Sequence, residues 1–191
     1  MIRLAILASG GGSNAAAILD YFQNHPQIQI VLIACNRKEA GVYQVAENHG
    51  VESIWLERER FQNGDAYLPE LKSRKIDGLI LAGFLWKVPT PLIQAFPDRI
   101  LNIHPALLPK FGGQGMYGIQ VHAAVLAAHE TVSGITIHRV DEHYDHGDPV
   151  FQAHCPVLLN DSPDSLAKRV LELEHTHYPP TIEKYFNKQN F

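Results

Sequence analysis

The chain has 191 residues, a net charge of −4, and a composition that is 46% hydrophobic and 19% charged. This length predicts one domain, and the composition is that of an ordinary globular protein. It has no run of Lys or Arg and no apolar stretch near the ~20 residues that span a bilayer, so we expect neither nucleic-acid nor membrane partners. The apolar start lacks a signal-peptide pattern, and Cys35 and Cys155 lie far apart, so we expect reduced thiols and a cytoplasmic protein.

The start of the chain combines a strand, a glycine-rich turn and a helix. Residues 2–8 are almost entirely apolar, as in a parallel strand buried on both faces, and residues 15–19 strongly favour a helix. Between them stands Ser-Gly-Gly-Gly-Ser-Asn, residues 9–14. Free backbone N–H groups at such a helix start bind anions, and glycine lets the ligand approach closely. The turn therefore fits a phosphate, to which Ser13 or Asn14 can also donate, and a tight turn without a ligand is the alternative.

The same turn matches the relaxed dinucleotide pattern, Gly10-x-Gly12-x-x-Ala15. That pattern requires an acidic residue at the end of the second strand, which binds the ribose hydroxyls. The second strand is expected at 29–35, and Asn-Arg-Lys follows it. A phosphomonoester therefore fits better than NAD, and NADP with Arg37 on its 2′-phosphate remains an alternative.

Strand and helix patterns alternate along the rest of the chain, which predicts an α/β fold. We expect a Rossmann-like, open, mostly parallel twisted sheet with helices on both faces. The expected helices are 40–48, 65–72, 90–96 and 121–129; the expected further strands are 51–55, 77–82, 100–103, 132–140 and 149–157. A last helix begins after the cap at Ser162, and Pro179-Pro180 is expected to break or kink it.

The expected strand 100–103 carries the strongest chemical signal. Asn102 and His104 are two residues apart and so point to the same side of a strand, and Pro105 then ends regular pairing. Ligands of open α/β sheets bind at this carboxyl edge. An amide and an imidazole side by side there can stabilise an oxyanion.

The loop 141–148 holds four acidic residues and two histidines. A carboxylate facing His104 would raise the pKa of its imidazole and hold its orientation. It would also accept the proton lost by an attacking amine. These side chains are potential metal ligands too, but zinc sites usually combine a short spacing with a distant second pair, so we expect no metal. The apolar, aromatic loop 83–89 follows another strand and fits a flat heterocycle.

Taken together, these motifs resemble the phosphoribosylglycinamide formyltransferases, folate-dependent enzymes of purine biosynthesis, over essentially the whole chain. The matching motifs are Ser9 to Asn14, Leu81-Ala-Gly-Phe84, Asn102-Ile-His-Pro105, Leu107-Leu-Pro-Lys110, Asp145-x-Gly147, Glu174-His175 and Tyr178-Pro179.

The resemblance implies a single formyltransferase domain over residues 1–191. Its phosphate-binding half would cover about 1–100, and its folate-binding and catalytic half about 101–191. The implied reaction moves the formyl group of 10-formyltetrahydrofolate to the amine of glycinamide ribonucleotide, giving formylglycinamide ribonucleotide and tetrahydrofolate on the route to IMP. Only small-molecule partners are implied, for a monomer or a homodimer.

The resemblance also implies roles for individual residues. The catalytic residues would be Asn102, His104 and Asp145. The phosphate and ribose would be bound by Gly12, Ser13, Asn14 and Glu174. The folate would be bound by Leu85, Trp86, Lys87, Val88, Asn102, His143 and Tyr144.

The chain departs from the family pattern in three places. Ala106 follows His-Pro where relatives have Ser, and Gly64 stands where an arginine contacts the folate tail. The loop 144–149 is one residue longer, which makes Asp148 a rival of Asp145. Two other functions remain alternatives: formyl transfer to a sugar-nucleotide amine, and an NADP-binding oxidoreductase.

Overall fold

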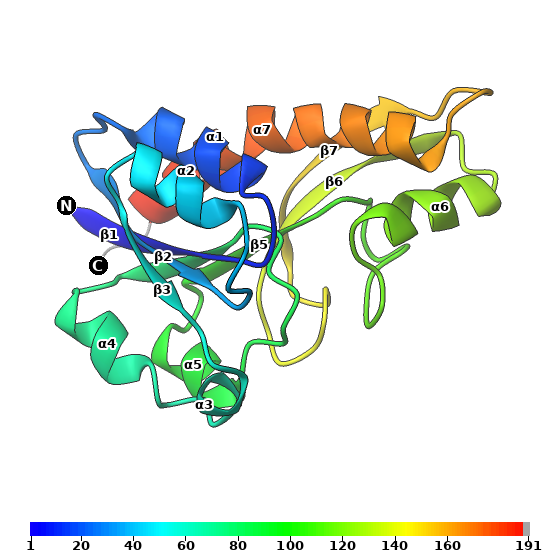
Figure 1. Ribbon diagram of the computed structural model, residues 1–191. Helices are drawn as coiled ribbons and strands as arrows, with labels where there is room; N and C mark the ends of the chain where they lie inside the picture. The colour runs from blue at the N-terminus through cyan, green and yellow to red at the C-terminus, as the bar shows by residue number, and fades with distance from the viewer. Residues whose placement is uncertain (189–191) are drawn as a thin grey trace.

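The computed structural model describes residues 1–188, and all seven of their strands form one sheet (Figure 1). The strands are β1 (Ile2–Ala8), β2 (Ile28–Cys35), β3 (Glu52–Trp55), β4 (Gly78–Leu81), β5 (Ile100–His104), β6 (Val132–Arg139) and β7 (Pro149–Pro156). Their order across the sheet is β3-β2-β1-β4-β5-β6-β7, and the first five are parallel. The β6 strand runs antiparallel to both β5 and β7, so the expected mostly parallel sheet is confirmed.

Helices cover both faces of the parallel part of the sheet, as expected (Figure 1). The helices are α1 (Ser13–Phe22), α2 (Val42–Asn48), α3 (Arg58–Gln62), α4 (Leu68–Ser73), α5 (Thr90–Ala95), α6 (Ile119–Ala127) and α7 (Pro163–Asn187). Alternate residues of β1 point to opposite faces: Leu4 and Ile6 pack with α1, α2 and α7, while Ala5 and Leu7 pack with α3, α4 and α5. Within residues 1–188, no helix is both long and apolar enough to cross a membrane.

Two helices differ from the expected pattern. The helix α3 was not predicted, because it has only five residues and no side chain caps its start. Its Phe61 is 3% exposed, so tertiary packing rather than local propensity holds it. The helix expected at 65–72 begins only at Leu68.

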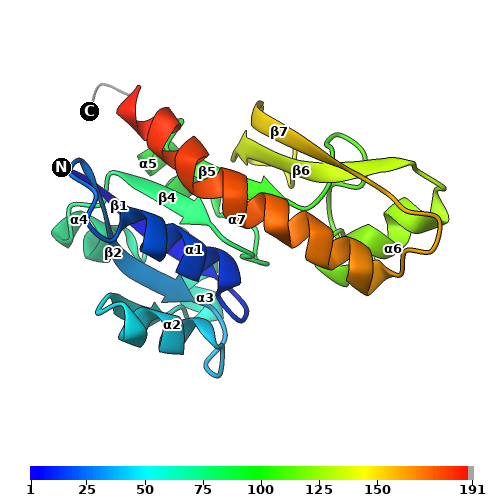
Figure 2. The same cartoon turned by 90° about the horizontal axis from the view of Figure 1, so that it is seen from above.

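Of the predicted break or kink at Pro179-Pro180, the break is wrong: α7 continues through both prolines to Asn187 (Figure 2). The packing of its buried side explains this. The Tyr178 hydroxyl shares its hydrogen between the carbonyls of Leu81, at 3.0 Å, and Leu101, at 3.1 Å. Pro179 is buried and Phe186 fully so, which holds the segment beyond the prolines against the sheet.

Two glycines hold turns that a larger residue would disrupt. At Gly12, φ is +84° and an added Cβ would lie 2.9 Å from Val42. At Gly64, φ is +79° and an added Cβ would lie 2.7 Å from the ring of Pro91. An arginine at position 64 therefore does not fit this backbone, which gives a physical reason for that departure from the family pattern.

Candidate active site

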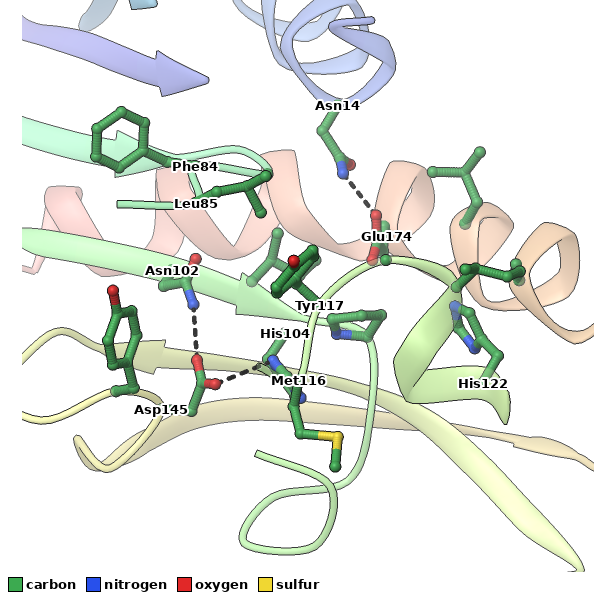
Figure 3. Close-up of a pocket in the computed structure, with 18 of the residues that line it drawn as sticks. Asn14, Phe84, Leu85, Asn102, His104, Met116, Tyr117, His122, Asp145 and Glu174 are labelled. Atoms are coloured by element: carbon green, nitrogen blue, oxygen red, sulfur yellow. Dashed lines mark hydrogen bonds and ion pairs between the residues drawn. The ribbon is translucent and has the colours of Figure 1, made fainter. Parts of the chain in front are cut away.

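A cavity of about 740 Å³ lies at the carboxyl edge of the sheet and joins segments from both halves of the chain (Figure 3). Its polar wall combines side chains from the end of β5, the starts of α1 and α6 and the first half of α7 with the loop after β6. The lining residues include Ser13, Asn14, Leu85, Asn102, His104, His122, Tyr144, Asp145, Lys168 and Glu174. The predicted phosphate loop and the predicted catalytic residues therefore share one cavity.

Three expected catalytic side chains meet at one end of this cavity (Figure 3). The Asp145 Oδ2 atom lies 3.5 Å from Nδ1 of His104, and its Oδ1 lies 3.4 Å from Nδ2 of Asn102. The backbone N–H of Gly113 donates to the same Oδ2 at 3.0 Å. The Asp145 carboxylate thus connects the imidazole, the amide and the loop that follows β5.

The hydrogen bonds of His104 indicate which of its nitrogens exchanges a proton. Its Nε2 lies 2.7 Å from the carbonyl oxygen of Phe111, which can only accept, so Nε2 carries a hydrogen. The other nitrogen, Nδ1, faces Asp145 and is the position at which a proton can be taken up and released.

The Asp145 charge raises the pKa of His104, as expected, but it does not decide the net shift. Burial lowers the pKa of His104, and this effect outweighs the opposing attraction of the Asp145 charge. Burial also raises the pKa of Asp145, but the nearby imidazoles of His138 and His104 and the Gly113 N–H together bring it below its ordinary value. The free protein therefore holds an ionised carboxylate beside an imidazole that gives up its proton readily.

The side chain of Asn102 is oriented by His138, which lies opposite it on β6. The His138 Nδ1 donates to the Arg139 carbonyl at 2.7 Å, which leaves Nε2 to accept from Asn102 Nδ2 at 3.0 Å. The second N–H of Asn102 makes only the long 3.4 Å contact with Asp145. For Asn102 to donate a hydrogen bond to a ligand, this N–H therefore has to give up only its weak contact with Asp145.

The structure separates the two candidate carboxylates of the loop after β6. The side chain of Asp148 is 75% exposed and forms an ion pair with Arg139, whereas that of Asp145 is 10% exposed and lies beside His104. Asp145 also has a φ of +54°, which places it in the left-handed region. Asp148 does not line the main cavity.

The other end of the cavity combines the start of α1 with the middle of α7. The Asn14 Nδ2 donates to Oε2 of Glu174 at 2.5 Å, although the two residues are 160 positions apart. Burial raises the pKa of Glu174, and the bond from Asn14 opposes this rise only in part. Ser13 lines the same end, whereas Gly12 lies behind it and does not line the cavity.

Six of the expected folate-binding residues line a smaller, adjoining cavity of about 60 Å³, and four of them line this one alone: Trp86, Lys87, Val88 and His143. Tyr144, Asn102 and Asp145 line both cavities, and Leu85 lines only the larger one. Phe84, Trp86 and the buried Phe61 form an aromatic cluster with ring centroids 5.4–6.2 Å apart. Apolar, aromatic surface of this kind suits a flat heterocycle.

The glycines of the phosphate loop also border a separate groove on the far side of the turn. Gly10, Gly11, Arg37 and Lys38 line this groove, which shares no lining residue with the main cavity. A dinucleotide phosphate bound there would leave His104 and Asp145 without a function. Among residues 1–188, no group of three or more His, Cys, Asp or Glu side chains is arranged to hold a metal ion.

The sequence analysis did not identify His138 and His122 as parts of the site. The strand alternation of β6 contained a signal for His138, since it pairs directly with Asn102 across β5 and β6. His122 had no such signal, because its place in the cavity depends on how α6 packs. Glu174 lies on the buried side of the last helix, with Val170 and Tyr178.

Comparisons with known proteins agree with this geometry. The formyl transferase family matches residues 2–182. A chloroplastic phosphoribosylglycinamide formyltransferase of Arabidopsis thaliana is 42% identical over 94% of this chain, and the match spans 64% of that protein. A phosphoribosylglycinamide formyltransferase of Bacillus subtilis is 31% identical, and the match covers this whole chain and 97% of that protein.

Solved structures give the same result. The phosphoribosylglycinamide formyltransferase of Brucella melitensis has a TM-score of 0.87 and 35% identity, over 100% of this chain and 98% of that one. The phosphoribosylglycinamide formyltransferase of Anaplasma phagocytophilum has a TM-score of 0.89 and 29% identity, over 100% of this chain and 89% of that one. From the family match, these relatives and the shared fold, we conclude that the chain belongs to the formyl transferase family, among its phosphoribosylglycinamide formyltransferases.

Proposed function

We propose that this protein transfers the formyl group of 10-formyltetrahydrofolate to the amine of glycinamide ribonucleotide, as a step of purine biosynthesis. The products are formylglycinamide ribonucleotide and tetrahydrofolate. One observation carries the proposal: a single cavity joins the start of α1 and Glu174 to Asn102, His104 and Asp145. That arrangement gives a phosphorylated amine a place beside groups able to assist attack on a carbonyl.

The first step forms a bond between the substrate amine nitrogen and the formyl carbon. The electron pair of the formyl C=O moves to oxygen and gives a tetrahedral oxyanion. We assign its stabilisation to His104 and to the Asn102 N–H that makes only the 3.4 Å contact with Asp145. The bond from Asn102 to His138 remains and keeps the amide oriented.

The second step breaks the bond between the formyl carbon and the folate nitrogen. The proton lost by the amine passes to the Asp145–His104 pair, directly or through water, and Nδ1 of His104 then delivers a proton to the departing nitrogen. The lowered pKa of His104 favours this delivery, because the protonated imidazole is a readier acid. The pair returns to its starting state with no net gain of protons.

The two substrates occupy different parts of the site in this proposal. The phosphate lies at the start of α1 on Ser13 and Asn14, with Gly12 shaping the turn, and the ribose hydroxyls meet Glu174. The pterin lies where the smaller cavity adjoins the main one and is bound by Leu85, Trp86, Lys87, Val88, Asn102, His143 and Tyr144. Both cysteines are buried free thiols, which supports a reducing, cytoplasmic setting.

A spectrophotometric assay tests the proposal. Protein, 10-formyltetrahydrofolate and glycinamide ribonucleotide are mixed, and the ultraviolet absorbance is followed for loss of the formyl group from folate. We expect deformylation that depends on the ribonucleotide. Deformylation without it indicates a hydrolase, and deformylation with a sugar-nucleotide amine alone indicates the other transferase; either result contradicts the proposal.

A further inference from the structure

One buried histidine in the main cavity has no part in the reaction proposed above. His122 lies on α6, is 4% exposed and lines the cavity. Its Nδ1 atom is buried and has no hydrogen-bond partner among residues 1–188. A buried polar atom without a partner lowers the free energy of unfolding by about 1–3 kcal/mol, so a histidine at this position calls for an explanation.

The surroundings of His122 point to an anion as the missing partner. In Figure 3, His122 lies far from Asp145, beyond Glu174 and the Met116–Tyr117 segment. The α1 helix starts after Gly12 with no side-chain cap bond, so its first backbone N–H groups remain available there. Lys168 brings a positive charge to the same cavity from α7.

We propose that His122 is a substrate-binding residue, whose imidazole donates a hydrogen bond to the phosphate of the ribonucleotide from the α6 side of the cavity. This inference rests on the proposed function for the identity of the ribonucleotide. It adds a contact that the α1 loop alone does not provide. A rotation of the ring about its Cβ–Cγ bond would bring Nδ1, which is buried in the free structure, to the phosphate oxygens, and these are strong acceptors.

Protonation makes the contact dependent on pH. Burial, and then the neighbouring His104, lower the pKa of His122, so the free protein carries this ring uncharged at neutral pH. The other titratable residues that line the cavity are Tyr117, Tyr144, Asp145, Lys168 and Glu174. A phosphate dianion favours the charged ring, so binding takes up a proton and strengthens as the pH falls toward the pKa of the free ring.

Steady-state kinetics of three variants test the contact. His122→Phe keeps a ring without a donor, His122→Gln keeps an N–H donor, and His154→Gln is the control at an exposed position of β7. We expect His122→Phe to raise the KM for the ribonucleotide about tenfold to a hundredfold, as for loss of a hydrogen bond to a charged group. We expect a smaller rise for His122→Gln, none for His154→Gln, and an unchanged KM for the formyl-folate.

A substrate without phosphate separates binding from a structural role. With the dephosphorylated glycinamide nucleoside, wild type and His122→Phe should have the same KM. An equal rise with both substrates, or a fall in kcat with an unchanged KM, overturns the inference.

Calorimetry with ribose 5-phosphate gives a readout that does not require catalysis. Titrations in two buffers of different ionisation enthalpy should show proton uptake for wild type and none for His122→Gln. Equal uptake by both proteins overturns the inference. If the wild type transfers no formyl group, the proposed function fails, and this titration still decides whether His122 binds phosphate.

Discussion

The Oδ2 atom of Asp145 lies 3.5 Å from Nδ1 of His104, and the two side chains are only 10% and 4% exposed. Little solvent therefore screens this pair, and its charge depends on the groups that touch it. The Gly113 N–H and the Phe111 carbonyl are two such groups, and both belong to the loop after β5. The proton chemistry of the site is thus tied to the position of that loop.

Asp145→Asn should reduce kcat by about a hundredfold to ten-thousandfold, the usual contribution of a positioned acid–base group. Asp148→Asn is the matched control from the same loop. It should keep near wild-type rates, because an exposed ion pair such as Asp148–Arg139 contributes only about 0–1 kcal/mol. Steady-state rates of both variants check this, and a greater loss in Asp148→Asn would reverse the assignment.

An NMR titration of the His104 ring should give a pKa below the ordinary value of 6.5, because burial is the dominant cause of its shift. In Asp145→Asn this pKa should fall further, since the carboxylate that favours the charged ring is gone. The measurement needs no catalytic activity. A pKa that rises in Asp145→Asn would show that the carboxylate does not act on His104.

Asn102→Ala should lower kcat by roughly a hundredfold to a thousandfold, as for loss of an oxyanion donor. The KM for the ribonucleotide should change little, since the contact forms mainly in the transition state. Kinetics at saturating folate measure both values. Near-normal turnover would refute the oxyanion role.

His138→Phe should lower kcat by about tenfold to a hundredfold, the range found when a supporting partner is lost. The reason is that Asn102 loses the acceptor that holds its amide 3.0 Å away. His138→Gln, which retains an acceptor, should recover part of the rate. Equal losses in the two variants would instead indicate a packing role, and the melting temperature should be followed alongside.

Glu174→Gln should stabilise the protein at neutral pH while weakening substrate binding. Burial raises the pKa of Glu174, so its contribution to stability is complete below the unfolded value and is lost as the pH rises through the folded one. Gln does not ionise, so the melting temperature should exceed that of wild type by a few degrees at pH 7.5, at roughly 2–4 °C per kcal/mol.

Near pH 4 the difference between Glu174→Gln and wild type should shrink, because the wild-type carboxyl is then protonated. Calorimetric melting at both pH values checks this. The KM for the ribonucleotide should rise about tenfold, in line with a weakened bond to a charged group. A variant less stable than wild type at pH 7.5 would contradict the prediction.

Local sequence rules predicted the parts of the site that a strand or a turn positions by itself. The two-residue spacing of Asn102 and His104 at a strand end was enough to place both in the main cavity. The glycine turn before α1 likewise placed Ser13 and Asn14 there.

The parts that depend on packing between distant segments could not be predicted in the same way. The net pKa shift of His104 depends on burial by the whole fold, which no local pattern reports. The helical pattern would place a charged residue such as Glu174 on the exposed side of α7. Its burial depends instead on the hydrogen bond from Asn14, which offsets the cost of burying a polar group. The continuity of α7 past Pro179 depends on tertiary contacts that override a helix-breaking residue.

The Tyr178 hydroxyl makes α7 a link between the two ends of the site. It joins the helix to Leu81, the last residue of β4 before the loop to which we assign the pterin, and to Leu101, next to Asn102. One turn earlier the same helix carries Glu174. A shift of α7 along its axis would therefore move Glu174, to which we assign the ribose, relative to Asn102, so a core substitution far from the cavity can lower activity by misaligning the two substrates.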